Sequence, residues 1–210
     1  TFRDHDGLWE NYNVYEVATP EAWHMNKDLV LEFYNKRRSD VKNASPNAGH
    51  RALADLEDHF DVQVITQNID DLHERAGSKN VLHLHGEIFK ARSTADDTVF
   101  PIEGTELNPG DTCPLGSQLR PHIVWFGEEV PMLEKAIPLF ETADIVIVAG
   151  TSLEVYPAAG LIQFARKAET CILVDPKMPP ALNASKYTWF NEKAATGLPK
   201  AAAWLRQRFG

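Results

Sequence analysis

Short apolar runs alternate with helical patterns along this chain, and this alternation constrains the fold more than any other feature. The strand-like runs are DVQVIT (61–66), NVLHLH (80–85), DIVIVAG (144–150) and TCILVD (170–175). Three of them are almost continuously apolar, as expected of strands that are covered on both faces of a parallel sheet. The alternation therefore predicts a doubly wound α/β sheet.

The segments between and after these runs have the length and apolar spacing of helices. They are 45–60, 132–143, 156–169 and the C-terminal 194–209. In the first of them, Ser45 is expected to be the N-cap and Pro46 to occupy the first helical position.

Two segments do not follow the alternation, and they predict a smaller lobe inserted into the sheet domain. Residues 8–43 are helical in pattern and rich in aromatic side chains. Residues 87–121 carry polar turn sequences and only short strand-like pieces such as TVFPIE (98–103). The sheet domain is then expected to comprise 44–86 and 122–210.

Composition excludes several classes of protein. The net charge is −9 and the pI is about 5.3, so the chain would repel a nucleic acid backbone. The most apolar run, 143–150, is far shorter than the roughly 20 residues that cross a bilayer, and the start TFRDHDG is not a secretory signal. Cys113 and Cys171 are too few for a disulfide framework. We therefore expect a cytoplasmic protein without nucleic acid or membrane partners.

Polar residues follow the first predicted strand. Gln67, Asn68 and Asp70 come directly after DVQVIT, and the carboxyl ends of strands in an open α/β sheet lie over the crevice where ligands bind. A purely structural interpretation remains open here, in which Asn68 caps a short helix from Asp70 to Ala76.

A second candidate ligand-binding turn follows the strand that ends at Gly150. Gly150, Thr151 and Ser152 would direct backbone N–H groups and hydroxyls into the crevice, which suits phosphate or ribose oxygens. An ordinary strand-to-helix turn with an N-cap has the same residues, so this signal alone does not decide between the two.

The motif VLHLHGE contains two histidines that are two residues apart. His83 and His85 are therefore expected on one face of a strand that Gly86 ends. A histidine at a strand end is usually a structural residue, but His85 would share an edge of the crevice with Gln67, Asn68 and Asp70.

Six motifs in a fixed order resemble the sirtuin family of NAD-dependent protein-lysine deacylases: TFRDHDGLW, TQNIDDLHERAG, LHGE, RPHIVWFGE, GTSLEVYPAAGL and EKAATGLP. The resemblance extends from Thr1 almost to the end of the chain. It implies a Rossmann-like sheet domain and a reaction in which the acyl oxygen of a modified lysine attacks C1′ of the nicotinamide ribose. The products are free lysine, nicotinamide and O-acyl-ADP-ribose, so acyl-lysine proteins or peptides are the implied partners.

The resemblance also implies roles for individual residues. His85 would be the general base that removes a proton from a ribose hydroxyl, a task for which a neutral imidazole is well suited. Residues 1–7 would be what remains of a mobile cofactor loop, and Ile69 would line the nicotinamide pocket. The implied cofactor contacts are Phe2, Arg3, Gln67, Asn68, Ile69, Asp70, Gly150, Thr151, Ser152, Asp175 and Ala194.

Two segments match those that hold the substrate peptide as an added strand in sirtuins. They contain Val124, Trp125, Phe126, Gly127 and Glu128, and Val155 with Tyr156 following Glu154. Trp125 fits equally well as a core aromatic, and a core position is an alternative for Phe126 as well.

The helix EFYNKRR places Tyr34 and Arg37 at positions i and i+3 on one face. In a helix of unknown context, Tyr34 would simply pack and Arg37 would be solvated. In the sirtuin subgroup that removes succinyl, malonyl or glutaryl groups, such a Tyr-x-x-Arg binds the distal carboxylate of the acyl group. Ala18, in ATP at 18–20, resembles the small pocket-wall residue of that subgroup.

The chain departs from the family pattern in three places. Sirtuins carry a strand and a glycine-rich turn upstream of the position of Thr1, so the first strand and part of the NAD site are expected to be missing from the sequence as it stands. Residues 87–121 resemble a degenerate zinc ribbon, because Cys113 stands alone where sirtuins carry four cysteines, and no zinc is expected. Asp175 stands where sirtuins usually carry an asparagine near the adenosine ribose. Its carboxylate can still accept hydrogen bonds from the ribose hydroxyls.

The sequence therefore predicts a bacterial-type sirtuin that removes acidic acyl groups, and acetyl groups as well. Three alternatives remain: a deacetylase in which Tyr34 and Arg37 have no role in acyl recognition, a non-catalytic NAD or ADP-ribose binding module, and an unrelated nucleotide oxidoreductase.

Overall fold

The computed structural model describes residues 12–210, and the chain forms two compact units. Of the described residues, unit 1 comprises 12–44, Asn68–Asp71 and His85–Val130, and unit 2 comprises Ser45–Gln67, Leu72–Leu84 and Pro131–Gly210. The chain therefore passes between the units several times. This division differs from the expected boundaries, which assigned all of 44–86 and 122–210 to the sheet domain.

Backbone hydrogen bonds explain why unit 1 takes these additional segments. The Ile88 N–H donates to the Ile69 carbonyl at 2.8 Å, and the Val124 N–H donates to the His85 carbonyl at 2.9 Å. The residues that follow the first predicted strand are thereby attached to the antiparallel strands of unit 1.

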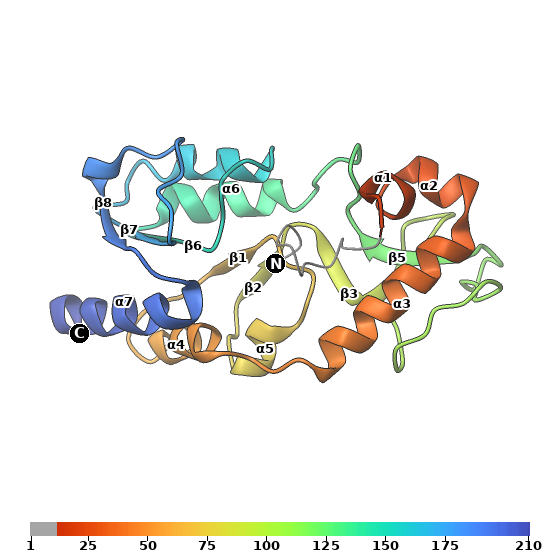
Figure 1. The fold of residues 1–210 in the computed structure, drawn as a ribbon, viewed down its shortest axis with the longest axis horizontal. Helices are drawn as coiled ribbons and strands as arrows, with labels where there is room; N and C mark the ends of the chain where they lie inside the picture. Colours follow the sequence, from red (N-terminus) through yellow and green to blue (C-terminus); the bar gives the residue numbers. More distant parts are fainter. Residues whose placement is uncertain (1–11) are drawn as a thin grey trace. The chain divides into compact units, whose positions relative to one another are not determined.

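Three helices and a three-stranded antiparallel sheet make up the described part of unit 1 (Figure 1). The helices are α1 (Val14–Val17), α2 (Pro20–Met25) and α3 (Lys27–Asn43). The sheet has the order β4 (Val99–Pro101), β3 (Gly86–Ser93), β5 (Leu119–Ile123). Thr19 caps α2 ahead of Pro20 in its first turn, and Asn26 caps α3.

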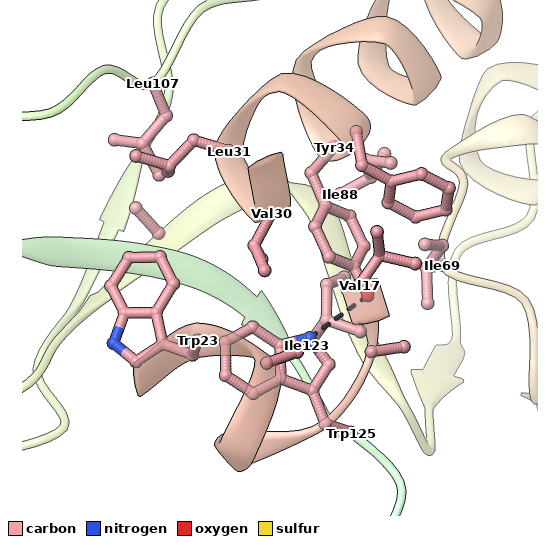
Figure 2. Packing of buried hydrophobic residues seen from close by; sticks show 14 residues of the cluster. Val17, Trp23, Val30, Leu31, Tyr34, Ile69, Ile88, Leu107, Ile123 and Trp125 are labelled. Atoms are coloured by element: carbon pink, nitrogen blue, oxygen red, sulfur yellow. Dashed lines mark hydrogen bonds between the residues drawn. The ribbon is translucent and has the colours of Figure 1, made fainter. Parts of the chain in front are cut away.

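The core of unit 1 lies between α3 and the β3–β5 pair and includes α1 and α2 (Figure 2). Its fully buried members come from every third or fourth position of α3, as in Val30, Phe33 and Tyr34, and from β3, as in Ile88. An amphipathic helix packed on one face of a sheet is the simplest way to bury both apolar surfaces.

Unit 2 contains two parallel sheets. One pairs β1 (Val64–Thr66) with β2 (Val81–His83), and the other has the order β6 (Ile145–Ala149), β7 (Thr170–Val174), β8 (Tyr187–Phe190). The helices are α4 (Ala48–Leu56), α5 (Leu72–Ala76), α6 (Leu133–Thr142) and α7 (Ala194–Phe209), with 3₁₀ segments η1 (Ala158–Phe164) and η2 (Ala184–Lys186). Parallel strands with intervening helices confirm the expected Rossmann-like α/β class.

The helices of unit 2 enclose two apolar clusters around β7. In one, α7 lies beside α4 (Figure 1) and both pack against Ile172 and Val174. In the other, Val146, Val148 and Leu173 pack with the residues of η1. Central β7 is therefore buried on both faces, as its continuous apolar sequence predicted.

Several local expectations were wrong. Asn47, not Ser45, caps α4, since its side chain accepts from the N–H groups of Gly49 and His50. The segment predicted as a helix over 156–169 forms a 3₁₀ segment over only Ala158–Phe164. Strands β3 and β8 were not predicted.

In the described residues, no helix is long and apolar enough to cross a membrane.

Candidate functional site

His85 lies in the two-residue turn between β2 and β3, not within a strand. Gly86 follows with a φ of +85°, and a Cβ at this position would lie 2.0 Å from the His122 carbonyl oxygen. The turn therefore requires glycine at position 86. It leaves the His85 side chain half-buried while its backbone carbonyl is bonded to Val124.

His83 has a different environment from His85. Its side chain is buried, and Nε2 lies 2.7 Å from the Glu74 carboxylate of α5. The shared strand face predicted for the two histidines is wrong, because β2 ends at His83. His83 is a structural residue of unit 2, and His85 belongs to unit 1.

Residues 68–70 alternate in burial. Ile69 is buried in the core of unit 1, whereas Asn68 is exposed and Asp70 is half-buried. The bond from Ile88 to the Ile69 carbonyl fixes this segment beside the start of β3. Asn68, Asp70 and His85 belong to unit 1, whereas Gln67, which was predicted to share the same crevice edge, belongs to unit 2.

In unit 2, the predicted cofactor residues gather at the carboxyl ends of parallel strands. Gly150 follows β6 and its N–H donates to the Val174 carbonyl at the end of β7. A Cβ at Gly150 would lie 3.8 Å from the Ala194 Cβ at the start of α7. Gly150 and Ala194, which were predicted from two separate motifs, are therefore neighbours at the edge of the sheet where open α/β folds bind ligands.

The turn after β6 has an unusual backbone. Gly150 has a φ of +60° and Leu153 has a φ of +54°, a conformation that non-glycine residues adopt uncommonly. The Thr151 hydroxyl accepts from the Leu153 N–H at 3.2 Å, and the Gln67 amide donates to the same hydroxyl at 3.5 Å. Thr151 is thereby connected to Gln67, while Ser152 is exposed.

Asp175 follows β7 at the same edge. One of its carboxylate oxygens accepts from the Lys177 N–H at 2.8 Å, and its backbone carbonyl accepts from the Trp189 indole at 2.9 Å. The carboxylate is half-buried and can accept further hydrogen bonds, as a ribose-binding group must.

Tyr34 and Arg37 both lie on the buried side of α3. The Tyr34 hydroxyl accepts from the Trp125 indole Nε1 at 3.0 Å (Figure 2). Burial raises the pKa of Tyr34 well above its ordinary value, so the hydroxyl stays protonated. Arg37 is paired with Asp40 at 3.1 Å, and its guanidinium lies 5.0 Å from the centre of the Phe33 ring.

Trp125 is a core aromatic, 2% exposed and packed against Trp23. Its backbone N–H donates to the Glu128 carboxylate, and the Phe126 N–H donates to the Ala18 carbonyl. Phe126 itself is half exposed. Within 124–128, Gly127 is the residue whose N–H makes no internal hydrogen bond. An added peptide strand would find its backbone donor there.

The second predicted peptide segment belongs to unit 2. The Val155 carbonyl accepts from the Ala159 N–H of η1, and Tyr156 is 66% exposed. Ala18 is buried at the end of α1 in unit 1. Phe2 and Arg3 lie outside the described residues.

The sequence interpretation did not identify Arg120, which is buried and pairs with Glu128. A signal was present in RPHIVWFGE, since a basic and an acidic residue flank a run that contains the apolar residues Ile123, Val124 and Trp125.

Among the described residues, no group of three or more His, Cys, Asp or Glu side chains could hold a metal ion. Cys113 is buried, and its sulfur accepts a hydrogen bond from the Ser93 hydroxyl at 3.3 Å.

Comparisons with known proteins identify the family to which this chain is similar. A family model described as "Sir2 family" matches residues 1–157. A protein of Helicobacter pylori (strain ATCC 700392 / 26695) named NAD-dependent protein deacylase is 50% identical over 194 residues, which cover 92% of this chain and 85% of that protein. A protein of the same name from Aggregatibacter actinomycetemcomitans is 52% identical over 184 residues, covering 87% and 88%.

Solved structures give the same picture. A structure described as a Sir2 homolog–NAD complex has a TM-score of 0.89 and 39% identity, and the match covers 100% of this chain and 84% of that one. Another, described as "The Structural basis of Sirtuin Substrate Affinity", has a TM-score of 0.78 and 30% identity, covering 100% and 87%.

Proposed function

This chain belongs to the Sir2 family and is an NAD-dependent protein deacylase, and we propose that it removes acidic acyl groups of the succinyl or malonyl type from lysine, and acetyl groups as well. The observation that carries the proposal is the pair of Tyr34 and Arg37 on α3. Both side chains are buried, and both offer hydrogen-bond donors suited to a carboxylate.

Tyr34 is suited to donate to an anion. Its hydroxyl accepts from the Trp125 indole, and burial raises its pKa, so the hydroxyl hydrogen is retained for another acceptor. A buried hydroxyl that donates to a carboxylate makes a charge-assisted hydrogen bond, which is stronger than one between neutral groups.

Arg37 would supply the compensating charge. Its guanidinium is planar and carries five donors, a geometry that matches a carboxylate in a bidentate pair. An acyl carboxylate that entered an apolar environment without such a partner would be strongly disfavoured. Ala18 would be the small wall residue of the acyl pocket.

The predicted cofactor residues of unit 2 would suit an NAD molecule. Gly150 presents backbone without a side chain at the carboxyl end of β6, Ala194 opens α7 beside it, and Asp175 offers a carboxylate to ribose hydroxyls. Bound NAD would supply the electrophilic ribose carbon and the nicotinamide leaving group. Gln67, Thr151 and Ser152 would bind the ribose and phosphate groups, and Asn68, Ile69 and Asp70 those near the nicotinamide, with Phe2 and Arg3 as further contacts.

His85 would act as general base. Its backbone is held by Val124, and its imidazole is half-buried at the turn before β3. A neutral imidazole can accept a proton from a ribose hydroxyl.

The peptide backbone would be held at two segments. Gly127 and the neighbouring carbonyls of Val124 and Phe126 would bind it in one, and Val155 with Tyr156 in the other. Such backbone pairing suits substrates that differ in sequence around the modified lysine.

A deacetylase without acidic preference is the second candidate, and the Arg37–Asp40 ion pair favours it. In that case Arg37 would stabilise the last turns of α3 and would not contact the substrate. Nicotinamide release from NAD, measured with peptides that differ only in carrying succinyl-, malonyl- or acetyl-lysine, separates the two candidates. A higher kcat/KM for the succinyl peptide is expected, and equal or lower values than for acetyl would refute the proposal.

Arg37→Met should lower kcat/KM for the succinyl peptide by roughly two to three decades. Removing one partner of a buried charged pair costs about 3 to 5 kcal/mol, and each 1.36 kcal/mol is tenfold in rate. The acetyl value should change by less than about tenfold, because an acetyl group has no distal carboxylate. Tyr34→Phe should also lower kcat/KM for the succinyl peptide more than for the acetyl peptide. Its loss should be smaller than that of Arg37→Met and correspond to about 1 to 3 kcal/mol.

Lys36→Met is the matched control, because Lys36 is an exposed cation one residue away on the same helix. It removes the same charge and should leave both substrates unaffected. Equal losses for succinyl and acetyl peptides in Arg37→Met would mean that Arg37 supports the helix instead.

A further inference from the structure

A chain of contacts in unit 1 runs from β5 to the Tyr34 hydroxyl. The Arg120 guanidinium donates from Nη1 to Glu128 Oε1 at 2.6 Å and from Nη2 to Glu128 Oε2 at 3.1 Å. Nη2 also donates to the Ile123 carbonyl at 3.0 Å. This bidentate arrangement orients both side chains, which are 9% and 17% exposed.

The same pair holds Trp125 from two directions. Glu128 Oε2 accepts from the Trp125 backbone N–H at 2.8 Å, which fixes the main chain. The Arg120 guanidinium lies 3.3 Å from the centre of the Trp125 ring, which fixes the plane of the indole. A planar guanidinium stacks on an aromatic ring in a way that an ammonium group does not.

Trp125 in turn determines what the Tyr34 hydroxyl can do. Its Nε1–H donates to that hydroxyl at 3.0 Å (Figure 2), and an indole N–H is a donor only. The hydroxyl hydrogen is therefore excluded from the side of Trp125 and is directed toward another acceptor. Tyr34 becomes a preoriented donor whose direction depends on the indole.

We propose that Arg120 and Glu128 are positioning residues for acyl selectivity, which hold Trp125 so that the Tyr34 hydroxyl faces the distal carboxylate of the acyl group as a donor. This inference rests on the proposed function. Arg120 would not bind the carboxylate itself, because both of its terminal nitrogens donate to Glu128 and one of them to Ile123.

Arg120→Lys tests the proposal while keeping the charge. An ammonium group cannot span both Glu128 oxygens and the Ile123 carbonyl, and it does not stack flat on the indole. The ratio of kcat/KM for succinyl and acetyl peptides should fall by roughly tenfold, the loss expected for one misdirected hydrogen bond. A general loss of stability would lower both values and leave the ratio unchanged.

Arg92→Lys is the matched control. Arg92 also donates to Glu128 Oε1, at 3.1 Å, but its guanidinium has no stacking contact with Trp125. The ratio should therefore stay near that of the wild type. An equal fall of the ratio in Arg92→Lys and Arg120→Lys would overturn the assigned role of the stacking contact.

A double-mutant cycle with Tyr34→Phe identifies the route of action. If Arg120 acts through the Tyr34 hydroxyl, Arg120→Lys should not lower the ratio further once that hydroxyl is absent. Additive effects of the two substitutions would overturn the proposal.

The Trp125 Nε1–H resonance in protein labelled with ¹⁵N-tryptophan gives a readout that does not depend on the acyl group. It should move in Tyr34→Phe and in Arg120→Lys, but not in Arg92→Lys. A wild type without preference for succinyl peptides would refute the proposed function. The resonance would still test the positioning of Trp125 by Arg120, and a signal that does not move in Arg120→Lys would overturn that proposal.

Discussion

At the scale of single residues, two histidines of the same motif have different environments. The sequence period placed His83 and His85 on one strand face, but β2 ends at His83, and His85 occupies the turn that Gly86 makes possible. Period-two reasoning fails where a strand ends, because the turn reorients the next side chain. His83 then bonds Glu74 within unit 2, whereas His85 stays half-buried in unit 1.

His85→Ala should lower deacylation by about 10²-fold or more, because a positioned general base contributes roughly 10²- to 10⁴-fold. The variant should remain folded, as judged by circular dichroism and thermal unfolding. His24→Ala is a suitable control, since His24 is an exposed histidine of the same unit. His83→Ala would be a poor control, because it leaves Glu74 without its buried partner. Near-normal turnover of His85→Ala would remove this residue from the mechanism.

Glu128 should contribute stability that is lost when the pH becomes acidic. Burial raises the pKa of its carboxyl, but hydrogen bonds from Arg120 and the Trp125 N–H, with the charges of Arg120 and Arg92, outweigh burial and lower it. A folded-state pKa below the unfolded value of about 4.3 stabilises the protein fully above that value. The contribution is lost as the pH falls through the folded-state pKa.

We therefore expect Glu128→Gln to lower the free energy of unfolding at pH 7 and to lose less stability than the wild type between pH 5 and pH 3. Urea unfolding at each pH measures both effects. Glu129→Gln, at an exposed neighbouring carboxylate, should behave like the wild type. A difference between wild type and Glu128→Gln that stays constant from pH 7 to pH 3 would contradict the coupling.

At the scale of elements, the sequence predicted the helices and strands that have one continuous apolar surface. The C-terminal helix was placed over 194–209, where α7 lies, and the runs at 144–150 and 170–175 contain β6 and β7. Strand β3 was missed, because GEIFKARS interleaves charged residues with the apolar ones that face the core of unit 1. An antiparallel strand with one solvated face lacks the continuous apolar run that revealed the parallel strands.

Helix boundaries were harder to predict than helices. Both Ser45 and Asn47 are good N-cap residues, and the sequence does not show which side chain reaches the free N–H groups. The structure uses Asn47, in a capping box with His50. The segment predicted over 156–169 keeps the apolar spacing of a helix but forms the shorter η1.

The turn region of unit 1 around Cys113 is closed by hydrogen bonds between protein groups. Ser93 donates to the Cys113 sulfur. The Gln118 side chain accepts from the Gly110 N–H and donates to the carbonyls of Asn108, Asp111 and Leu119. A structural zinc site normally needs four ligands, and Cys113 is the lone cysteine of 87–121.

We predict that the purified protein contains no stoichiometric zinc and that treatment with a chelator changes neither its Tm nor its activity. Elemental analysis together with thermal unfolding before and after chelation provides the measurement. One zinc per chain, or a fall in Tm on chelation, would show that ligands other than cysteine complete a site.

At the scale of the whole molecule, each of the two units is built from several separate segments of the chain. Gly150, Ala194 and Asp175 were assigned to one function, and they lie together at one sheet edge of unit 2. The repeated passage of the chain between units was not predicted. It depends on single backbone bonds, such as that from Ile88 to Ile69, which leave no trace in apolar periodicity.

This interleaving predicts that residues 131–210 do not fold alone, although they contain the whole β6–β7–β8 sheet. Their helix α7 buries Leu198 and Leu205 in a cluster that α4, which precedes residue 131, completes with Ala52 and Leu56. A Cβ at Gly49 would lie only 2.8 Å from the Ala194 carbonyl oxygen, so the two helices approach closely.

Removing α4 exposes apolar side chains of α7, among them Leu198 and Leu205. Burying one leucine contributes about 1.5 to 3 kcal/mol, which is a large share of a total stability of about 5 to 15 kcal/mol. The amide resonances of a 131–210 fragment should therefore be poorly dispersed. Joining residues 45–84 to 131–210 through a flexible linker restores α4, β1 and β2, and the dispersion should return. A well-dispersed spectrum from 131–210 alone would show that the sheet and α7 form a self-sufficient core, and that α4 covers a surface already stable without it.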